Sequence, residues 1–204
     1  MGRYTSIAKI ENEQETDWSK LKFNKGVIGI ERNDIILKGD NILRPEDIEV
    51  IPEALAAIRM MRLKGYEVVI FFNEPNISLG KITEKEVNDI MNKVMEQFGK
   101  HEIYSISGVL FATTNMRYDL YAMPHTGMLK RFEQNNKVSF KKNGYMVGDK
   151  FYNLKAGFNA GAIPILIKTR NYEETIERLN LFTNKKIKQK TKVFDNLLDF
   201  ATSL

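Results

Sequence analysis

The sequence has no cysteine, and its only histidines are His101 and His125. Without cysteine the chain has no disulfide, no thiol nucleophile and no thiolate ligand for a metal ion. Two histidines are too few for a histidine-rich metal centre. These absences exclude disulfide-stabilised folds and zinc centres of the thiolate or polyhistidine kind.

A long apolar run and a glycine-rich phosphate loop are also missing. No apolar stretch approaches the roughly 18 residues that a membrane span requires, and residues 1–20 lack the apolar segment of a secretory signal. The glycines of "GFNAGA" fall within an expected helix, whereas Walker and dinucleotide loops follow a strand. We therefore expect no membrane span and a cytoplasmic location. Because lysine, asparagine and isoleucine are abundant, as in AT-rich genomes, a viral or organellar assembly is an alternative location.

The composition is that of a globular protein with a basic segment near its end. The 204 residues, 43% of them hydrophobic and 28% charged, suit one domain with a substantial core. The net charge is +5, and residues 184–192 ("NKKIKQKTK") concentrate much of the excess. This segment is either a solvated face or loop, or a patch that meets nucleic acid or an acidic partner. Its lysines are Lys185, Lys186, Lys188, Lys190 and Lys192.

Apolar runs of strand length alternate with segments of helical periodicity. Residues 1–20 are expected to form a polar arm that docks through Trp18 and Leu21, and residues 21–204 a single α/β domain. Strands are expected at 27–30, 67–72, 105–114, 144–149 and 163–169, and helices at 52–65, 83–100, 126–136, 151–162, 171–182 and 193–204. This alternation predicts parallel pairing with right-handed crossovers. The expected architecture is a doubly wound, Rossmann-like three-layer domain with a mostly parallel sheet.

Such a fold places the loops after its strands at one edge of the sheet, where α/β enzymes bind their ligands. The loops concerned are 31–34, 72–80, 113–126 and 149–153. In that order they resemble the haloacid-dehalogenase-like (HAD) phosphohydrolases. The similarity is greatest to the branches of polynucleotide 3'-phosphatases and of heptose-bisphosphate and histidinol phosphatases. It covers residues 25–170 and implies a HAD-like fold without a large cap domain.

Three segments carry the resemblance. "KGYEVVIFFNEPNISLGKIT" is similar to the segment G-(apolar strand)-T-N-Q-x-G-I-x-x-G-K, and keeps Asn73, Gly80 and Lys81. "LYAMPHTGML" resembles Y-R-K-P-x-T-G-M and keeps Thr126. "GYMVGDKFYNLKAGFNAG" resembles the segment VGD-x-x-x-D with the helix that follows it. The resemblance therefore identifies Asn73, Gly80, Lys81 and Thr126 as remnants of a phosphate-binding arrangement.

The family's chemistry needs groups that this chain has replaced. The resemblance implies that an aspartate attacks phosphorus and a second aspartate, two residues later, protonates the leaving oxygen. Here Glu31 takes the nucleophile position and Asn33 the acid/base position. Glu31 is one methylene too long, and a misplacement of about 1 Å can cost a hundredfold in rate. An amide such as that of Asn33 cannot deliver a proton. Asp34 stands where the family has glycine.

The residues at the phosphate-binding and metal-binding positions also differ from those that the resemblance implies. Phe72 replaces the hydroxyl residue, Met123 the lysine, and Asn153 a carboxylate, so that only Asp149 matches the family's core set. Positive groups and metal must neutralise the transferring phosphoryl group, and each lost group weakens that effect. We also expect an aromatic cluster to fill the vacated pocket: Phe71, Phe72, Tyr118 and Tyr121.

These replacements predict a catalytically inactive pseudo-phosphatase. It would serve as a structural or binding module for a protein partner or a larger assembly, with no resident cofactor. The alternative is a weak or altered Mg²⁺-dependent phosphatase that acts on polynucleotide 3' ends or a small phosphoester, with Glu31 and Asp149 as metal ligands. A second alternative is non-catalytic nucleic-acid binding through the lysines of residues 184–192.

Overall fold

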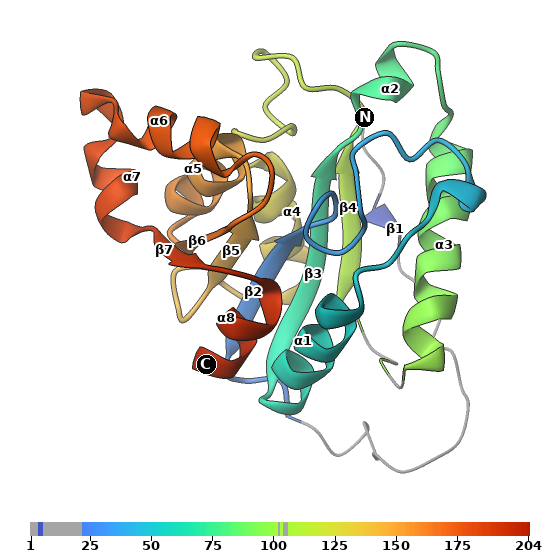
Figure 1. Ribbon diagram of the computed structural model, residues 1–204, viewed down its shortest axis with the longest axis horizontal. Helices are drawn as coiled ribbons and strands as arrows, with labels where there is room; N and C mark the ends of the chain where they lie inside the picture. Colours follow the sequence, from blue (N-terminus) through green and yellow to red (C-terminus); the bar gives the residue numbers. More distant parts are fainter. Residues whose placement is uncertain (1–3, 6–21, 102, 104–105) are drawn as a thin grey trace.

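The computed structural model describes residues 4–5, 22–101, 103 and 106–204. The predicted docking of an N-terminal arm through Trp18 and Leu21 lies outside the described residues. The described chain forms a central sheet whose strand order is β1-β4-β3-β2-β5-β6-β7 (Figure 1). The strands are β1 Tyr4–Thr5, β2 Gly26–Glu31, β3 Tyr66–Asn73, β4 Gly108–Ala112, β5 Tyr145–Gly148, β6 Ile163–Ile167 and β7 Lys192–Phe194.

Every neighbouring pair in this sheet is parallel except β1 with β4. The central strands are apolar runs because helices cover both faces of the sheet. In β3 every residue except Glu67 is buried. The helices are α1 Pro52–Leu63, α2 Pro75–Ser78, α3 Glu84–Lys100, α4 Gly127–Asn136, α5 Phe151–Ala160, α6 Tyr172–Asn180, α7 Lys185–Lys190 and α8 Leu197–Ser203, with 3-10 turns η2 Pro45–Asp47 and η3 Phe182–Asn184.

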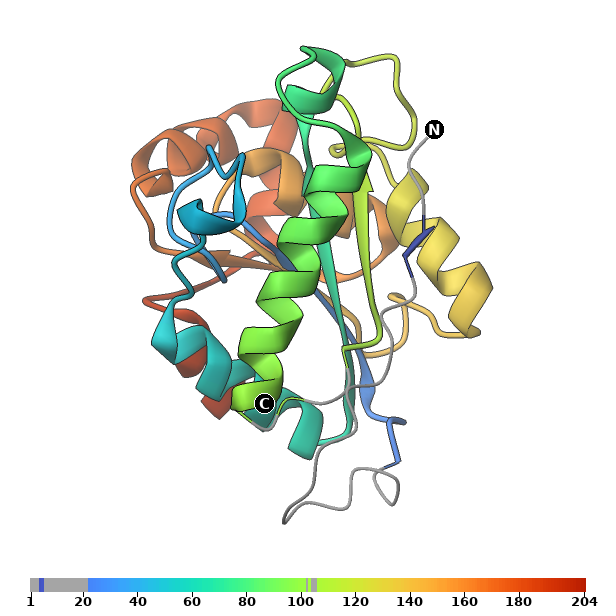
Figure 2. The ribbon, with the colours of Figure 1, turned by 90° about the vertical axis from the view of Figure 1, so that its right-hand side faces the viewer.

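The helices form two layers. Buried side chains of α1, α3 and α8 pack on one face of the sheet, and those of α4 and α5 on the other (Figure 2). Helices α6 and α7 pack outside α5, next to β6. The expected doubly wound, three-layer architecture is confirmed, and the described residues contain no separate cap domain. No described helix has the length and apolar character that crossing a membrane would take.

Local sequence signals account for most element boundaries. Thr83 and Glu86 form the predicted capping box of α3: the Thr83 side chain accepts the Glu86 N–H at 3.2 Å, and the Glu86 carboxylate accepts the Thr83 N–H at 2.8 Å. Pro52 opens α1, and Gly65 follows its end with φ 88°.

The C-terminal region differs from the expectation. Residues 193–204 were expected to be one helix, but β7 pairs with β6 before α8 begins. Asn196 separates the two elements because its side chain accepts the Asp199 N–H at 2.9 Å and so caps α8. The basic segment is not a loop either, since it forms α7, whose Ile187 is buried against α5 and α6. These short elements therefore depend on contact with the rest of the fold and, in α8, on the Asn196 cap.

The sheet has one topological switch point. The chain builds β2, β3 and β4 towards one edge and then β5, β6 and β7 towards the other, so the direction reverses between β2 and β5. In open α/β sheets, a crevice forms outside the carboxyl ends of the strands at such a point. The loops after β2, β3, β4 and β5 therefore meet there.

Candidate functional site

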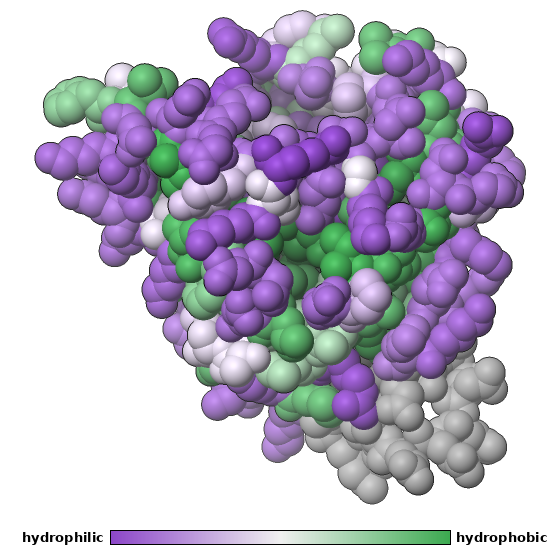
Figure 3. Space-filling model, in the orientation of Figure 1, coloured by the Kyte–Doolittle hydropathy of each residue, from purple (hydrophilic) through white to green (hydrophobic). Residues whose placement is uncertain are grey.

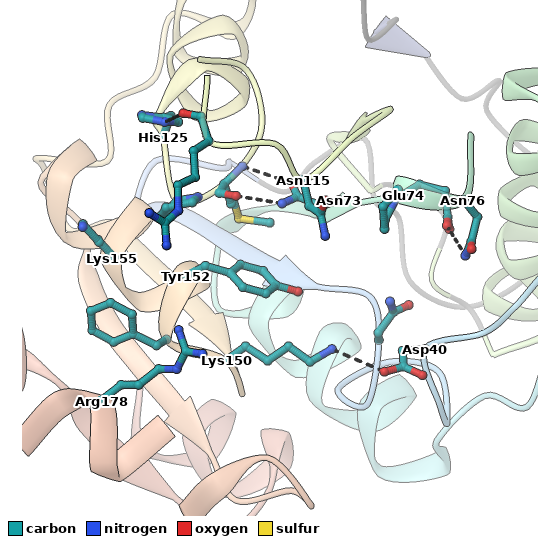
Figure 4. A pocket seen from close by; sticks show the side chains of 16 residues that line it. Asp40, Asn73, Glu74, Asn76, Asn115, His125, Lys150, Tyr152, Lys155 and Arg178 are labelled. Carbon is teal, nitrogen blue, oxygen red and sulfur yellow. Dashed lines mark hydrogen bonds and ion pairs between the residues drawn. The ribbon is translucent and has the colours of Figure 1, made fainter. Parts of the chain in front are cut away.

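A cavity of about 860 Å³ opens where these loops meet (Figure 4). Its volume lies within the range of roughly 300–1,000 Å³ that is usual for small-molecule sites. The lining residues include Asn33, Asp40, Asn73, Glu74, Met123, Lys150 and Tyr152. The expectation of a filled pocket was wrong. Phe72 is fully buried in the core, where its ring stacks on Phe111 at 5.4 Å between centroids, and it does not line the cavity.

Glu31 ends β2 beneath this cavity. Its side chain is fully buried. One carboxylate oxygen accepts the Asn153 amide at 2.5 Å, and the other accepts the Asn33 N–H at 3.4 Å. Burial, together with the nearby Asp149 carboxylate, raises the pKa of Glu31 from its ordinary value of 4.5 to about 7. A large fraction of this carboxyl is therefore protonated at neutral pH.

Arg32 is also fully buried, and its charge is neutralised inside the protein. Its Nη2 lies 2.8 Å from a Glu74 carboxylate oxygen, and its Nε donates to Asn33 Oδ1 at 2.8 Å. The guanidinium carbon lies 3.8 Å from the centroid of the Phe72 ring. Phe72 thus supplies a cation–π surface for Arg32 at the position where the resemblance expects a hydroxyl.

The backbone conformation of Asp34 supports the alignment of residues 31–34 with the family motif. Its φ of 58° lies in the left-handed region, which glycine adopts most readily. Glycine is the residue that the resemblance expects here. The Asp34 carboxylate accepts the Gly39 N–H at 3.0 Å and lies 3.0 Å from Arg170 Nη2, and Asp34 does not line the cavity.

Asp149, directly after β5, is buried near Glu31. Its Oδ2 accepts the Thr169 hydroxyl at 2.8 Å and the Asn171 amide at 2.6 Å. Its Oδ1 is buried and has no hydrogen-bond partner among the described residues. Burial raises the pKa of Asp149 as well. A cation between Asp149 and Glu31 would bind this free oxygen of Asp149. It would also reduce the electrostatic repulsion between the two carboxylates.

The described residues contain no cluster of three or more acidic or histidine side chains suited to a metal ion. Mg²⁺ does not need one, because it commonly binds to one or two carboxylates and completes its shell with water and substrate oxygens. Glu31 and Asp149 are a donor set of this type. Asn153 offers an amide where a further carboxylate is expected, and that amide already donates to Glu31.

Met123 and Asn73 form part of the cavity wall. The Asn73 amide nitrogen donates to the Met123 carbonyl at 2.8 Å, and the Met123 N–H donates to the Asn73 side-chain oxygen at 3.0 Å. Asn73 thus holds the loop after β4 in place. The structure therefore brings Glu31, Asn33, Asn73, Met123, Asp149 and Asn153 together at or just beneath the cavity floor.

Other predicted residues lie elsewhere. Gly80, Lys81 and Thr126 do not line the cavity: Gly80 ends the α2 turn with φ 67°, Lys81 is exposed, and Thr126 precedes α4. The lysines of residues 184–192 lie in and after α7, where hydrophilic side chains gather at the left of the space-filling view (Figure 3). They do not line the cavity either.

Several cavity residues were missed from the sequence. The cationic side chains of Arg117, Lys150, Lys155 and Arg178 line the cavity, and the Tyr152 hydroxyl points into it (Figure 4). Lys150 directly follows Asp149, and the first turn of a helix after a strand faces such a crevice, so its position was a usable signal. The sequence around Asp40 and Arg178 does not indicate that they line a cavity. Asp40 reaches it through the long loop after β2, and Arg178 reaches it from helix α6.

The charges of this cavity favour an anion. Both lining carboxylates belong to ion pairs: Asp40 lies 3.8 Å from Lys150 Nζ, and Glu74 lies 2.8 Å from Arg32 Nη2. Lys155 and Arg117 form no ion pair with another described residue. The lining has four cationic and two anionic side chains, and a cleft with an excess of one sign of charge concentrates ligands of the opposite sign.

Comparisons with known proteins identify a family and a related protein. A family model described as "Polynucleotide kinase 3 phosphatase" matches residues 38–191, most of the chain, and begins within the long loop after β2, beyond Glu31 and Asn33. A D-glycero-alpha-D-manno-heptose-1,7-bisphosphate 7-phosphatase of Photorhabdus laumondii is 28% identical, over 78% of this chain and 93% of that protein.

Solved structures show the shared fold. The D,D-heptose 1.7-bisphosphate phosphatase from B. bronchiseptica, complexed with magnesium and phosphate, has a TM-score of 0.76 and 19% identity, covering 87% of this chain and 97% of that chain. The D,D-heptose 1,7-bisphosphate phosphatase from Burkholderia thailandensis has a TM-score of 0.64 and 22% identity, covering 88% and 97%.

Proposed function

Since this chain belongs to the polynucleotide kinase 3 phosphatase family of HAD-like phosphohydrolases, we propose that it binds a small phosphoester in the cavity and hydrolyses it slowly with Mg²⁺. The open cationic cavity above Glu31 and Asp149 is the observation that supports this most directly. Family membership favours this activity over the inactive module expected from the replaced residues. The cavity volume favours a small phosphoester over a polynucleotide 3' end as substrate.

In this proposal Glu31 and Asp149 hold Mg²⁺, which when bound would neutralise charge on the phosphoryl group. Lys150 and Tyr152 face the cavity as donors to phosphoryl oxygens (Figure 4). The ionised Glu31 carboxylate attacks phosphorus while the bond from phosphorus to the leaving oxygen breaks; water then hydrolyses the acyl phosphate, which releases inorganic phosphate and regenerates the carboxylate. Asn153 must release Glu31 for this step, because its amide donates to the attacking carboxylate. Turnover is therefore slow.

One assay tests the proposal. Purified full-length chain is incubated with p-nitrophenyl phosphate and with a 3'-phosphorylated oligonucleotide, with Mg²⁺ or with a chelator. We expect Mg²⁺-dependent phosphate release from p-nitrophenyl phosphate that is lost in Glu31→Ala and in Asp149→Ala. Asp89→Ala removes an exposed carboxylate of α3 and serves as the matched control. Phosphate release that survives in Glu31→Ala would contradict the proposal.

A second candidate is phosphoester binding without turnover. The environment of Glu31 supports this candidate. Glu31 is fully buried, and it accepts a hydrogen bond from the Asn153 amide at a position where the family resemblance expects a carboxylate. This candidate predicts that inorganic phosphate binds, as measured by calorimetry, while no phosphoester is hydrolysed. Nucleic-acid binding through α7 and a protein partner stay predictions; salt-dependent binding of an oligonucleotide would support the former.

A further inference from the structure

Among the residues that the structure describes, none that lines the cavity offers an unpaired carboxyl group. Asn33 is the lining residue closest in sequence to Glu31, and its Oδ1 already accepts the Arg32 Nε–H at 2.8 Å. Its remaining polar group is the amide nitrogen, which can donate a hydrogen bond but cannot give up a proton near neutral pH. The other lining amides, Asn73, Asn76 and Asn115, have the same restriction.

The two carboxylates that line the cavity are paired with cations. Asp40 lies 3.0 Å from Arg170 Nη2 and 3.8 Å from Lys150 Nζ. Glu74 lies 2.8 Å from Arg32 Nη2 and also accepts the Asn76 amide at 2.9 Å. An ionised carboxylate only accepts hydrogen bonds. Both carboxylates are therefore already engaged as acceptors of cationic or amide donors.

The remaining titratable side chains are poor proton donors for this step. His125 Nε2 lies 2.7 Å from the Arg117 carbonyl, so a ring proton on that nitrogen is already donated to the backbone. Tyr152 is a phenol, which ordinarily ionises near about pH 10. A general acid works best when its pKa is near the working pH. The lysine and arginine side chains instead place positive charge around a departing anion.

We infer that the cleft acts on phosphoesters whose leaving group departs without a proton. Acyl phosphates, aryl phosphates and phosphoanhydrides belong to this class, whereas alkyl phosphates, the esters of ordinary sugars and alcohols, do not. The inference rests on the proposed function and names its substrate class. It follows from the pairing of Asn33 with Arg32 and of both lining carboxylates with cations.

The step balances without a protein acid. A bond forms between a Glu31 carboxylate oxygen and phosphorus while the bond from phosphorus to the leaving oxygen breaks. The electron pair stays on the leaving oxygen, which departs as a carboxylate, phenolate or phosphate anion beside Arg117 and Lys155. Water then attacks the acyl phosphate, its proton passes to solvent, and inorganic phosphate and the Glu31 carboxylate are released.

The test is a leaving-group series on the full chain with Mg²⁺: acetyl phosphate, p-nitrophenyl phosphate, phenyl phosphate and glycerol phosphate. We expect kcat/KM to fall at least 100-fold from p-nitrophenyl to glycerol phosphate, since general acid catalysis contributes roughly 10²–10⁴-fold where it operates. Asn33→Asp introduces a carboxyl group and should lower the ratio of kcat/KM for p-nitrophenyl phosphate to kcat/KM for glycerol phosphate. Asn180→Asp adds a carboxyl group at an exposed position of α6, outside the cavity, and should leave the ratio unchanged.

The outcomes separate this inference from the function on which it rests. Hydrolysis of all four compounds at rates within tenfold would overturn the leaving-group inference and leave the phosphatase proposal standing. Hydrolysis of none would overturn both. The wild-type series is decisive by itself if Asn33→Asp does not fold, because the ratio between aryl and alkyl phosphates needs no variant.

Discussion

Glu31 is held in an environment that favours its neutral form. It is fully buried, and Asp149 lies near enough to raise its pKa further, to about 7. An acid whose pKa is raised by folding binds a proton more tightly in the folded protein than in the unfolded chain. The Glu31 contribution to stability is therefore lost as the pH rises from the unfolded pKa of 4.5 through the folded pKa of about 7.

The first prediction concerns this pH dependence. In the presence of a chelator, raising the pH from 5 to 8 should lower the free energy of unfolding by a Glu31 contribution on the order of 3 kcal/mol. Glu31→Gln stays neutral at both values and should lack that contribution. Urea unfolding of both proteins at the two pH values measures it. Equal pH dependence in the two proteins would show that Glu31 does not titrate in this range.

The second prediction concerns the buried pair of Arg32 and Glu74. Removing one member leaves the other charge buried without a partner, which typically costs about 3–5 kcal/mol. Arg32→Met should therefore destabilise the protein strongly in urea unfolding, and adding Glu74→Gln should restore much of the loss. Lys85→Met, which breaks an exposed pair with Asp89, is the matched control and should change stability little. An equal loss in both single variants would contradict a special role for the buried pair.

At the scale of elements, short segments owe their form to caps and neighbours. Helix α8 is only Leu197–Ser203, too short to be stable alone. The Asn196 cap and the packing of Leu197, Phe200 and Ala201 in the core hold it. Strand β7, three residues long, depends in the same way on its pairing with β6.

The third prediction tests this cap. Asn196→Ala removes the acceptor for the Asp199 N–H and should lower the free energy of unfolding by about 1 kcal/mol. Asn180→Ala, at the exposed end of α6, is the control and should have an effect within about 0.5 kcal/mol. Chemical unfolding followed by circular dichroism measures both. A cap variant as stable as the control would mean that core packing alone holds α8.

At the scale of the whole molecule, the cleft combines parts of the chain that are far apart in sequence. Its floor comes from the ends of β2, β3 and β5, and its cations come from the loop after β4 and from the region of α5 and α6. The lysines of α7 form a separate basic surface. Two positive regions therefore lie on one molecule, and only one of them lines the cavity.

The fourth prediction distinguishes these two regions. Lys155→Ala should weaken the binding of inorganic phosphate or raise KM for p-nitrophenyl phosphate several-fold, and added salt should reduce the difference from wild type. Lys188→Ala removes the same charge from α7 and should leave both values unchanged. Calorimetry and steady-state kinetics measure the effect. Equal losses in the two variants would place the anion outside the cavity.

Much of the architecture could be predicted from the sequence, because periodicity and capping are local. The apolar run of β3 and the capping box of α3 have the expected form. The replaced residues Glu31, Asn33, Met123 and Asn153 were also predicted to share one edge of the sheet, since the carboxyl ends of parallel strands meet there. Phe72 shows the limit of this reasoning. It lies beneath Arg32 in the core and does not fill the pocket.

The sequence by itself determined the alternation of the longer strands and helices from β2 to α6, the doubly wound fold and the identity of the groups at the sheet edge, since these follow from local pattern and residue type. Only the tertiary structure decided that the cleft stays open, that Arg32 is neutralised by Glu74, and that Asp40, Lys155 and Arg178 line the cavity. The physical reason is that burial and ion pairing depend on neighbours distant in the chain. Those neighbours raise the pKa of Glu31 and pair Asp40 and Glu74 with cations.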